Sequence, residues 1–308
     1  MRLIQIPRPG GPEVLEVRER PMSAPSSDQI VVRMAAATVN PTDLLLRERG
    51  AGDEVPPPWT PGTEIAGTIH TAAPGTGYHA GERVFGIVNP RRIEGGAQAE
   101  FVTMPAASVV RTPENVTDQA AATVPMNGLT VVQALRRLKL QRGDTLGVIG
   151  SAGAVGQYAI QLGVAAGLRV VADAKPEDEE LVRGFGARAI VPRSGDPAAA
   201  FLSAVPDGVD GLIDAAVIDE LALGAIRDGG ALATLRRWNG PTERGIRIEP
   251  VWVADDNENT EALQELADHL RAGRLTARIA VALPMDQIQD AHRLLEAGGV
   301  RGRIVLVA

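Results

Sequence analysis

Residues 146–157 read Leu146-Gly147-Val148-Ile149-Gly150-Ser151-Ala152-Gly153-Ala154-Val155-Gly156-Gln157. An apolar run leads into small residues, and the helix-compatible segment Tyr158–Leu162 follows. Aligned with G-x-G-x-x-G, the turn reads Ser151-x-Gly153-x-x-Gly156, with serine in place of the first glycine. Small residues let the backbone approach a pyrophosphate closely, and the following helix offers unpaired N–H groups to that anion. The stretch predicts a dinucleotide-binding turn, with a tight strand–helix turn that holds no ligand as the alternative.

Strand-like and helix-like segments alternate around this turn. Apolar β-branched runs are expected to be strands, and the segments between them helices. The expected helices are 127–139, 154–166, Glu177–Gly184 and Glu220–Arg227, and the expected strands are Thr145–Ile149, Arg169–Ala172, Ala189–Val191, Val209–Asp214 and Gly230–Leu235. Such alternation forms βαβ units, so this region predicts an α/β fold with a parallel sheet.

The two ends of the chain have a different texture. Residues 1–120 are rich in proline, glycine and threonine, with short β-branched runs such as Ile30–Met34 and Arg83–Val88. After an irregular segment at 236–256, an amphipathic helix is expected, followed by a strand, a helix and a strand. These elements are expected at Thr260–Ala272, Arg278–Leu283, Met285–Ala297 and Arg303–Val307. The β-rich start and the α/β middle therefore predict separate domains.

Composition excludes several classes of protein. The 308 residues carry 31 basic and 38 acidic side chains and no cysteine. Without cysteine the chain has no disulfide framework, thiolate zinc site, iron–sulfur cluster or cysteine nucleophile. The net charge of −7 and the scarcity of aromatic residues argue against nucleic acid as a partner. Since no apolar run matches a membrane span or a signal peptide, we expect a soluble cytoplasmic protein.

Three charged residues bear on the choice of nucleotide. Asp173 ends the strand after the turn, where an acid accepts hydrogen bonds from the adenosine ribose and favours NAD. Lys175 and Arg193, which follow this strand and the next, are placed to pair with the 2′-phosphate of NADP. Only Lys139 and Lys175 among the basic residues are lysines, so a lysine in this loop is suggestive. These residues leave both nucleotides open, as well as a solvated loop lysine.

Several motifs together resemble one enzyme family. They are Asn40-Pro41-Thr42-Asp43, Pro61–Gly67, Gly81–Gly86, Gly95–Val102, Gly128–Leu135, the turn Ser151–Gly156 and the tail Val300–Leu306. Over essentially the whole chain, this is similar to the zinc-free quinone oxidoreductase (zeta-crystallin-like) branch of the medium-chain dehydrogenase/reductase superfamily. The resemblance implies an α/β fold in which a Rossmann dinucleotide-binding domain (123–273), with a doubly wound parallel sheet, is inserted into a GroES-like β-barrel catalytic domain (1–122 plus 274–308). It also implies NADPH as the cofactor and a homodimer, with 260–272 and 278–283 near the contact.

The zinc ligands of related alcohol dehydrogenases are replaced in this chain. Those enzymes carry a cysteine in the segment that here reads Thr38–Asp43, and a His-Glu pair where this chain has Thr63-Glu64. Glu64 alone does not supply the three or four donors that zinc takes, and the four histidines (His70, His79, His269 and His292) lack ligand spacing. We therefore expect no metal, which favours hydride transfer to a quinone or an enone over alcohol–ketone interconversion.

The resemblance also implies roles for individual residues. Asn40 and Asp43 match the motif that faces nicotinamide and substrate, and Thr130 matches a position near the nicotinamide ribose. Asn127, Trp59 and Trp238 are expected to border the substrate. Leu235, Arg236, Val251 and Trp252 are expected to hold the carboxamide, and Arg303 to reach the cofactor phosphates. The remaining expected cofactor contacts are Ser151, Ala152, Gly153, Ala154, Val155, Asp173, Lys175 and Arg193.

The main hypothesis is an NADPH-dependent reductase of a quinone or a conjugated double bond. Many family members carry a tyrosine after the Asn-Pro-x-Asp motif, where this chain has Leu44-Leu45-Leu46, so the proton donor stays open. One alternative is an NADH-dependent reductase or tailoring enzyme on the same fold, which Asp173 favours. Another is a catalytically weak, NADPH-binding regulatory protein.

Overall fold

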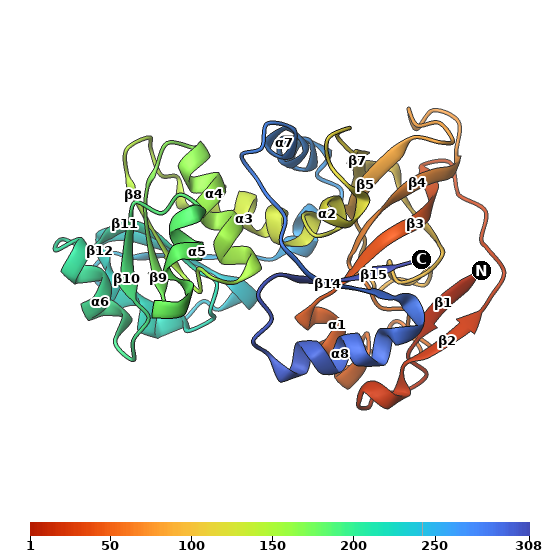
Figure 1. Cartoon of the computed structure of the whole chain (residues 1–308), viewed down its shortest axis with the longest axis horizontal. Helices are drawn as coiled ribbons and strands as arrows, with labels where there is room; N and C mark the ends of the chain where they lie inside the picture. Colours follow the sequence, from red (N-terminus) through yellow and green to blue (C-terminus); the bar gives the residue numbers. More distant parts are fainter. Residues whose placement is uncertain (242) are drawn as a thin grey trace. The chain divides into compact units, whose positions relative to one another are not determined.

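The computed structural model describes residues 1–241 and 243–308, which divide into two compact units (Figure 1). One unit comprises Met1–Met126 and Asn257–Ala308, and the other comprises Asn127–Asp256. These limits differ from the expected boundaries, because 257–273 groups with the first unit. Helix α7 (Thr260–Arg271) contacts strand β7 (Val109–Arg111), and the Thr260 hydroxyl donates to the carbonyl oxygen of Ala107 at 2.7 Å.

The first unit is built on a seven-stranded sheet in the order β14-β15-β3-β4-β5-β7, with β6 paired to β3. The strands are β3 (Gln29–Val39), β4 (Glu64–Ala72), β5 (Arg83–Ile87), β6 (Phe101–Pro105), β7, β14 (Ile279–Pro284) and β15 (Arg303–Val307). A two-stranded sheet, β1 (Arg2–Gln5) with β2 (Glu16–Glu19), and helices α1 (Pro41–Arg49), α2 (Asp118–Ala122), α7 and α8 (Ile288–Ala297) complete the unit. Strand β15 pairs antiparallel with β3, so the two ends of the chain share one sheet, as the resemblance implies.

Strand β3 positions the polar residues of the first unit. Its side chains Ile30, Val32 and Met34 are buried in the hydrophobic core of this unit. Strand β3 pairs with β4, β6 and β15. The burial of these side chains determines the register of β3, because a slip by one residue would turn them to the other face of the sheet. The polar residues Thr38 and Asn40, at the end of β3, are consequently held at fixed positions beside the start of β4.

The second unit contains a parallel sheet in the order β10-β9-β8-β11-β12-β13. Its strands are β8 (Thr145–Ile149), β9 (Arg169–Ala174), β10 (Ala189–Pro192), β11 (Val209–Asp214), β12 (Ile226–Thr234) and β13 (Arg247–Pro250). Its helices are α3 (Pro125–Leu138), α4 (Ala154–Ala165), α5 (Glu179–Gly184) and α6 (Pro197–Ala204). This strand order is that of a dinucleotide-binding Rossmann fold, and the reversal of order between β8 and β11 marks the place where ligands bind.

Three elements of the second unit differ from expectation, and one of them is strand β13, which lies in the segment 236–256 that was expected to be irregular. The helix expected at Glu220–Arg227 is wrong: a 3-10 helix spans Asp219–Ala225, and β12 begins at Ile226, which is buried and pairs with Val209. Burial in the sheet outweighs the local helix propensity there. Helix α6 was not predicted, although Asp196 caps it by accepting from the Ala199 amide at 3.0 Å and proline opens it.

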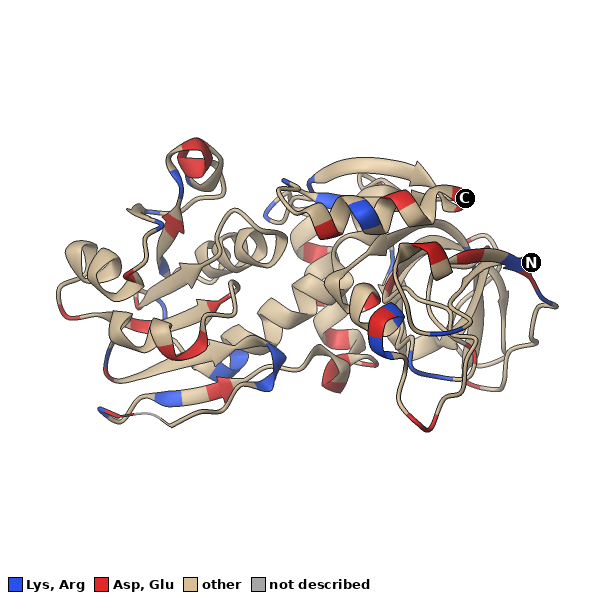
Figure 2. Ribbon diagram, turned by 90° about the horizontal axis from the view of Figure 1, so that it is seen from below, with Lys and Arg blue, Asp and Glu red and all other residues tan. Residues whose placement is uncertain are grey.

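Figure 2 shows acidic and basic residues interspersed along the ribbons of both units. In the part of the chain that the structure describes, no helix is long and apolar enough to cross a membrane.

Candidate functional site

The turn between β8 and α4 needs glycine at two positions. Gly150 has a φ of +82°, and a Cβ there would lie 2.9 Å from backbone atoms of Ala215 and Ala216. A Cβ on Gly156 would lie 2.3 Å from the Gly150 carbonyl oxygen, so only glycine lets α4 start this close to the strand. Ser151, which replaces the first glycine of the motif, is buried and donates its hydroxyl to the Val148 carbonyl at 2.9 Å. Ser151 through Val155 thus lie at the turn and at the N-terminus of α4, where an anion is favoured.

Asp173 holds this turn from the end of β9. Its Oδ1 atom accepts hydrogen bonds from the amides of Gly150 at 2.7 Å and Ser151 at 3.0 Å. The side chain is 7% exposed, and its Oδ2 atom lies 3.8 Å from Nε of Arg193. A carboxylate engaged in this way stabilises the turn, which adds a role that the resemblance does not imply.

A pocket of about 180 Å³ opens at the carboxyl ends of β8 to β11. Its walls are mostly apolar, with charged and polar groups from Asp173, Arg193 and Ser194. Arg193 is 47% exposed, and Lys175 is 52% exposed with its Nζ atom 3.9 Å from Glu177. Both cations follow the strands that border the pocket, and both leave donors free for solvent or an anion. Position and polarity are those expected for the adenosine half of a dinucleotide.

The loop after β11 forms another wall of this pocket and is organised by Asp214. This carboxylate is fully buried and accepts from the amides of Ala216 at 3.0 Å and of Ile218 and Asp219 at 2.7 Å each. Burial raises the pKa of Asp214, and the three amide donors offset part of that rise. Between these anchored amides, Val217 has a φ of +56°, a conformation that β-branched residues rarely adopt.

Replacing Val217 by glycine is expected to raise the free energy of unfolding by about 0.5–1 kcal/mol. The left-handed conformation costs an L-residue about 1–2 kcal/mol, and the greater entropy of unfolded glycine cancels part of that gain. Urea titration of the variant measures the change. Val205→Gly is the matched control, because Val205 has a φ of −135° and glycine there is expected to destabilise. Equal destabilisation by both changes would contradict strain at Val217.

The four residues expected at the carboxamide lie together. Leu235 and Arg236 follow β12, and Val251 and Trp252 follow the adjacent strand β13. The Val251 amide donates to the Thr234 carbonyl at 2.8 Å, and the Arg237 guanidinium lies 4.6 Å from the Trp252 ring centre. Arg236 adopts a φ of +62° in this segment. Their contact with a cofactor stays a prediction.

Helix α3 carries Asn127 and Thr130, which are 5% and 9% exposed. The Nδ2 atom of Asn127 is buried without a hydrogen-bond partner among the residues that the structure describes. Since a buried unpaired amide costs about 1–3 kcal/mol, we expect a ligand or a water molecule to complete it. The predicted place of Asn127 beside the substrate is consistent with this orphaned donor.

The two tryptophans expected at the substrate pack against hydrophobic cores. Trp59 is 7% exposed, belongs to the core of the first unit and donates its Nε1–H to the Val55 carbonyl at 2.7 Å. Trp238 packs against the hydrophobic cluster of the second unit. Burying a large ring against its own unit contributes to folding at both positions, and a contact of either ring with the substrate stays a prediction.

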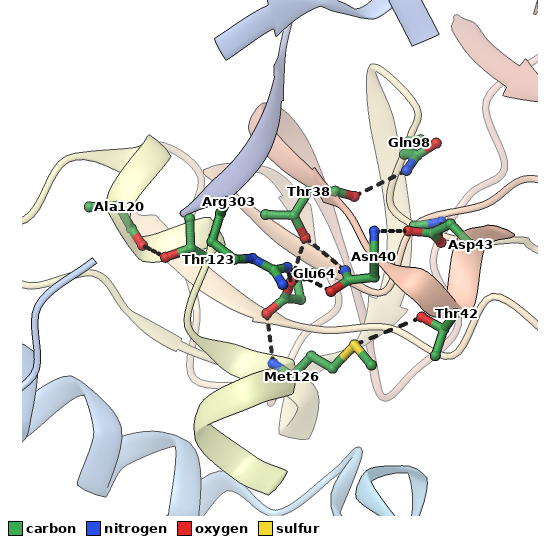
Figure 3. Close-up of polar contacts among 11 residues, drawn as sticks. Thr38, Asn40, Thr42, Asp43, Glu64, Gln98, Ala120, Thr123, Met126 and Arg303 are labelled. Atoms are coloured by element: carbon green, nitrogen blue, oxygen red, sulfur yellow. Dashed lines mark hydrogen bonds and ion pairs between the residues drawn. The ribbon is translucent and has the colours of Figure 1, made fainter. Parts of the chain in front are cut away.

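A buried polar cluster occupies the place in the first unit where the resemblance locates the catalytic motif (Figure 3). Glu64 Oε2 accepts from Arg303 Nη2 at 2.5 Å, from Asn40 Nδ2 at 3.1 Å and from the Thr38 hydroxyl. Its Oε1 accepts from the amide of Met126 at 2.8 Å. Arg303 Nη2 also donates to Asn40 Oδ1 at 2.7 Å. Sequence reasoning missed Thr38 and did not predict this network, whose members are distant along the chain.

The cluster changes the interpretation of three predicted site residues. Arg303, expected at the cofactor phosphates, is 7% exposed and paired with Glu64 and Asn40. Asn40 and Asp43 are fully buried in this structure. The oxygens of Asp43 accept from the amides of Asn40 at 2.7 Å and Gly62 at 2.8 Å, which joins the start of α1 to the segment before β4. These contacts hold the three side chains in place, and the expected roles of Asn40, Asp43 and Arg303 beside nicotinamide, substrate and cofactor phosphates stay predictions.

Burial raises the pKa of Asp43 to about 7, although the two amide donors and Arg303 oppose the rise. The folded protein therefore binds a proton more readily than the unfolded chain between about pH 4 and about pH 7. The stabilising contribution is present at the acidic end of this window and is lost as the pH rises, with a slope of at most about 1.4 kcal/mol per pH unit.

Asp43→Asn is expected to remove this part of the pH dependence, because the amide does not titrate. Urea midpoints measured across the window for the wild type and the variant test this. Asp53→Asn, at an exposed position of the same unit, is the control that is expected to keep the wild-type slope. A wild-type slope retained by Asp43→Asn would contradict the assignment.

Comparisons with known proteins agree with both units. The model for the Alcohol dehydrogenase GroES-like domain matches residues 26–114, and that for Zinc-binding dehydrogenase matches residues 185–306. The chloroplastic NADPH-dependent alkenal/one oxidoreductase of Arabidopsis thaliana is 26% identical, covering 96% of this chain and 77% of that protein. The quinone oxidoreductase of Mus musculus is 25% identical, covering 100% and 98%. A crystal structure of an NAD-dependent alcohol dehydrogenase is 26% identical, with a TM-score of 0.90 over 100% of both chains.

The residues of this chain do not fit the zinc that one of these family descriptions names. The chain has no cysteine, and no group of three or more His, Asp or Glu side chains gathers among the described residues. Glu64 directs its two oxygens to Arg303 and to other donors of the cluster, whereas zinc takes three or four nitrogen, sulfur or oxygen ligands. The two matched domains, the paired terminal strands and the Rossmann strand order establish that the chain belongs to the medium-chain dehydrogenase/reductase superfamily.

Proposed function

We propose that the protein is an NADPH-dependent reductase that transfers hydride to a quinone or to a conjugated enone without a metal ion. The observation that carries this proposal is the glycine turn beside an apolar pocket at the switch point of the Rossmann sheet. The substrate class is supported by the names of the relatives, an alkenal/one oxidoreductase and a quinone oxidoreductase. The donor set of the Glu64 cluster, which does not suit zinc, supports an acceptor that needs no Lewis acid.

The residues present suit a dinucleotide. The backbone at Gly150 and Gly156 leaves no room for a Cβ, which is the close approach that a pyrophosphate needs. The first turn of α4 follows Gly153, whose lack of a side chain leaves this N-terminus without a side-chain cap. The α4 N-terminus would therefore receive the pyrophosphate, and the pocket between Asp173 and Leu221 the adenosine.

Arg193 and Lys175 support NADPH over NADH. One oxygen of Asp173 is already bonded to two amides of the turn, and the other faces Arg193. Asp173 is therefore less suited to be a free acceptor for a ribose diol than the sequence alone indicates. Arg193 and Lys175 keep about half of their side-chain surface exposed.

Bound NADPH supplies a hydride, which moves to the electrophilic carbon of an enone or to a quinone. The substrate then takes one proton, so that two electrons and two protons are added in total and NADP⁺ is released. The chain orients the two reactants and excludes water, and Asn127 is the buried donor available for a substrate oxygen. Since no tyrosine lies in the segment after Asn40–Asp43, solvent or a weak acid supplies the proton.

Oxidation of NADPH followed at 340 nm with a panel of quinones and enones tests the proposal. Turnover with at least one member of either class is expected, and prior dialysis against a zinc chelator is expected to leave the rate unchanged. NADPH binding without turnover across the panel would favour the regulatory alternative. A clear preference for NADH would favour the NADH-dependent one.

We also propose a homodimer, for which the resemblance of α7 and β14 to family contact elements is the support. Strand β14 is an edge strand of its sheet, and its residues Ile279, Ala280 and Ala282 are exposed. An apolar edge strand is a ready surface for pairing. Light scattering coupled to gel filtration is expected to give twice the chain mass, and Ile279→Lys, at an exposed position of β14, is expected to shift the protein to monomer. Activity in the cytoplasm stays a prediction from the sequence.

A further inference from the structure

We propose that Asp214 is a positioning residue that builds the adenosine wall of the nucleotide pocket by holding residues 216–219 in a strained loop. The inference rests on the proposed function, because it specifies how the same nucleotide site is formed. Asp214 ends β11 at the switch point of the sheet, next to β8 and its glycine turn. Its carboxylate is fully buried, so it acts on a ligand only through the loop.

The hydrogen bonds of Asp214 all go to this loop. Three amides within five residues, those of Ala216, Ile218 and Asp219, donate to its two oxygens at 2.7–3.0 Å. The loop is also tied to the glycine turn, because the Ala215 amide donates to the Ile149 carbonyl at 2.9 Å. Gly150 is packed directly against the backbone of Ala215 and Ala216. Asp214 therefore holds the loop against the phosphate-binding turn.

The conformation that Asp214 imposes on the loop is unfavourable for Val217. Val217 and Asp219 have φ values of +56° and +53°. Asparagine and aspartate tolerate this region, but a β-branched residue does not. A loop of this sequence is expected to relax to negative φ when the carboxylate no longer bonds its amides. The strain thus identifies Asp214 as the group on which the loop conformation depends.

The loop matters to a ligand because it lines the pocket. Ala216, Ile218 and Leu221 form an apolar wall, and Leu221 is 65% exposed, which marks it as a surface to be covered. Asp173, Arg193 and Ser194 from the ends of β9 and β10 provide the polar lining. This arrangement suits adenosine, because the flat purine ring would pack against the apolar wall and the ribose and its phosphate would face the polar side chains. We expect the nicotinamide half to bind outside this pocket, so the effect of Asp214 is expected to be specific to the adenosine half.

Asp214→Asn tests the proposal. The amide replaces one oxygen by a donor, so the side chain no longer accepts all three N–H groups. Calorimetric binding of 2′,5′-ADP, which carries only the adenosine half of the cofactor, is expected to weaken about tenfold, since a hydrogen bond to a charged group contributes about 1.5 kcal/mol. Turnover with reduced nicotinamide mononucleotide, which lacks adenosine, is expected to stay within about twofold of the wild type.

Asp210→Asn is the matched control. Asp210 lies on the same strand near its other end, and it also accepts a backbone amide, that of Thr145 at 2.7 Å. The control is expected to leave 2′,5′-ADP affinity unchanged. If Asp214→Asn also leaves it unchanged, or weakens both probes equally, the positioning role is overturned.

Rescue adds a readout that a general loss of stability does not produce. Adding Val217→Gly to Asp214→Asn removes the strain and is expected to restore 2′,5′-ADP affinity to within about threefold of the wild type. If Asp214→Asn alone does not fold, the double variant is expected to fold and to bind 2′,5′-ADP within about threefold of the wild type, and a folded double variant that has lost this affinity overturns the proposal. If the wild type binds neither 2′,5′-ADP nor 5′-ADP, the proposed function itself fails, which is a different outcome from equal binding by wild type and variant.

Discussion

Arg303→Met is expected to lower the free energy of unfolding by about 3–5 kcal/mol, because it leaves a buried carboxylate without its counter-ion. Glu64 is fully buried, and Arg303 is 8% exposed in its side chain, so water does not replace the missing charge. The change also removes the donor to Asn40 Oδ1. Methionine is chosen because it fills much of the volume of the arginine stem, which limits the effect of an added cavity.

A double-mutant cycle with Glu64→Gln separates the ion pair from the rest of the network. Glutamine keeps an acceptor for the Met126 amide, so this variant tests mainly the charge. Each single change is expected to be strongly destabilising, and the double variant to cost at least about 2 kcal/mol less than their sum, because no charge is then left unpaired. Additive effects would contradict the pairing of Glu64 with Arg303.

Arg83→Met is the matched control in the same unit. Arg83 pairs with Asp118 at 2.7 Å, but its side chain is 37% exposed and that of Asp118 is 27% exposed. Ion pairs open to water contribute about 1 kcal/mol or less. The ratio of the losses in unfolding free energy caused by Arg303→Met and Arg83→Met therefore measures the effect of burial on an ion pair. Equal losses in the two variants would indicate that the Glu64 cluster is hydrated.

Three strands could be predicted from local sequence patterns alone. The strands Thr145–Ile149, Val209–Asp214 and Arg303–Val307 match their predicted bounds, because short β-branched runs at the centre of a sheet have few alternatives. The segment Glu220–Arg227 has a helix-like composition, yet Ile226 joins β12. Its strand partner Val209 is not visible from local sequence.

The polar clusters could be predicted only in part, since their members meet through the tertiary fold. Arg303 and Glu64 are 239 residues apart in the chain, and the resemblance directed Arg303 to a phosphate rather than to this carboxylate. Asp173 was expected to face a ribose because its place at the end of β9 is visible in the sequence, whereas its bonds to Gly150 and Ser151 are not. An acidic residue at the end of a buried strand was an available signal for Asp214, which sequence reasoning did not use.

The second large effect is expected at Arg193. Replacing it by alanine is expected to raise the KM for NADPH about 10- to 100-fold while the KM for NADH changes less than about threefold, because charge-assisted bonds to phosphate contribute about 1.5–3 kcal/mol. Only NADPH carries the 2′-phosphate that this guanidinium is placed to meet. Lys175→Ala is expected to have the same direction and a smaller effect, since Lys175 does not line the pocket.

The control for Arg193 lies at the opposite end of the same strand. Arg188 precedes β10 and is exposed, whereas Arg193 follows it, so Arg188→Ala removes one positive charge from the same unit at the edge away from the pocket. A local contact changes the cofactor ratio only in the Arg193 variant, and a general field effect changes it in both. Measurement at higher ionic strength helps to separate the two explanations. Salt screens the field of a charge about 10 Å away more strongly than it weakens a direct ion pair. If neither variant alters the ratio of NADPH to NADH, discrimination at the ribose belongs to Asp173, and the NADH-dependent alternative gains the support that the proposed function loses.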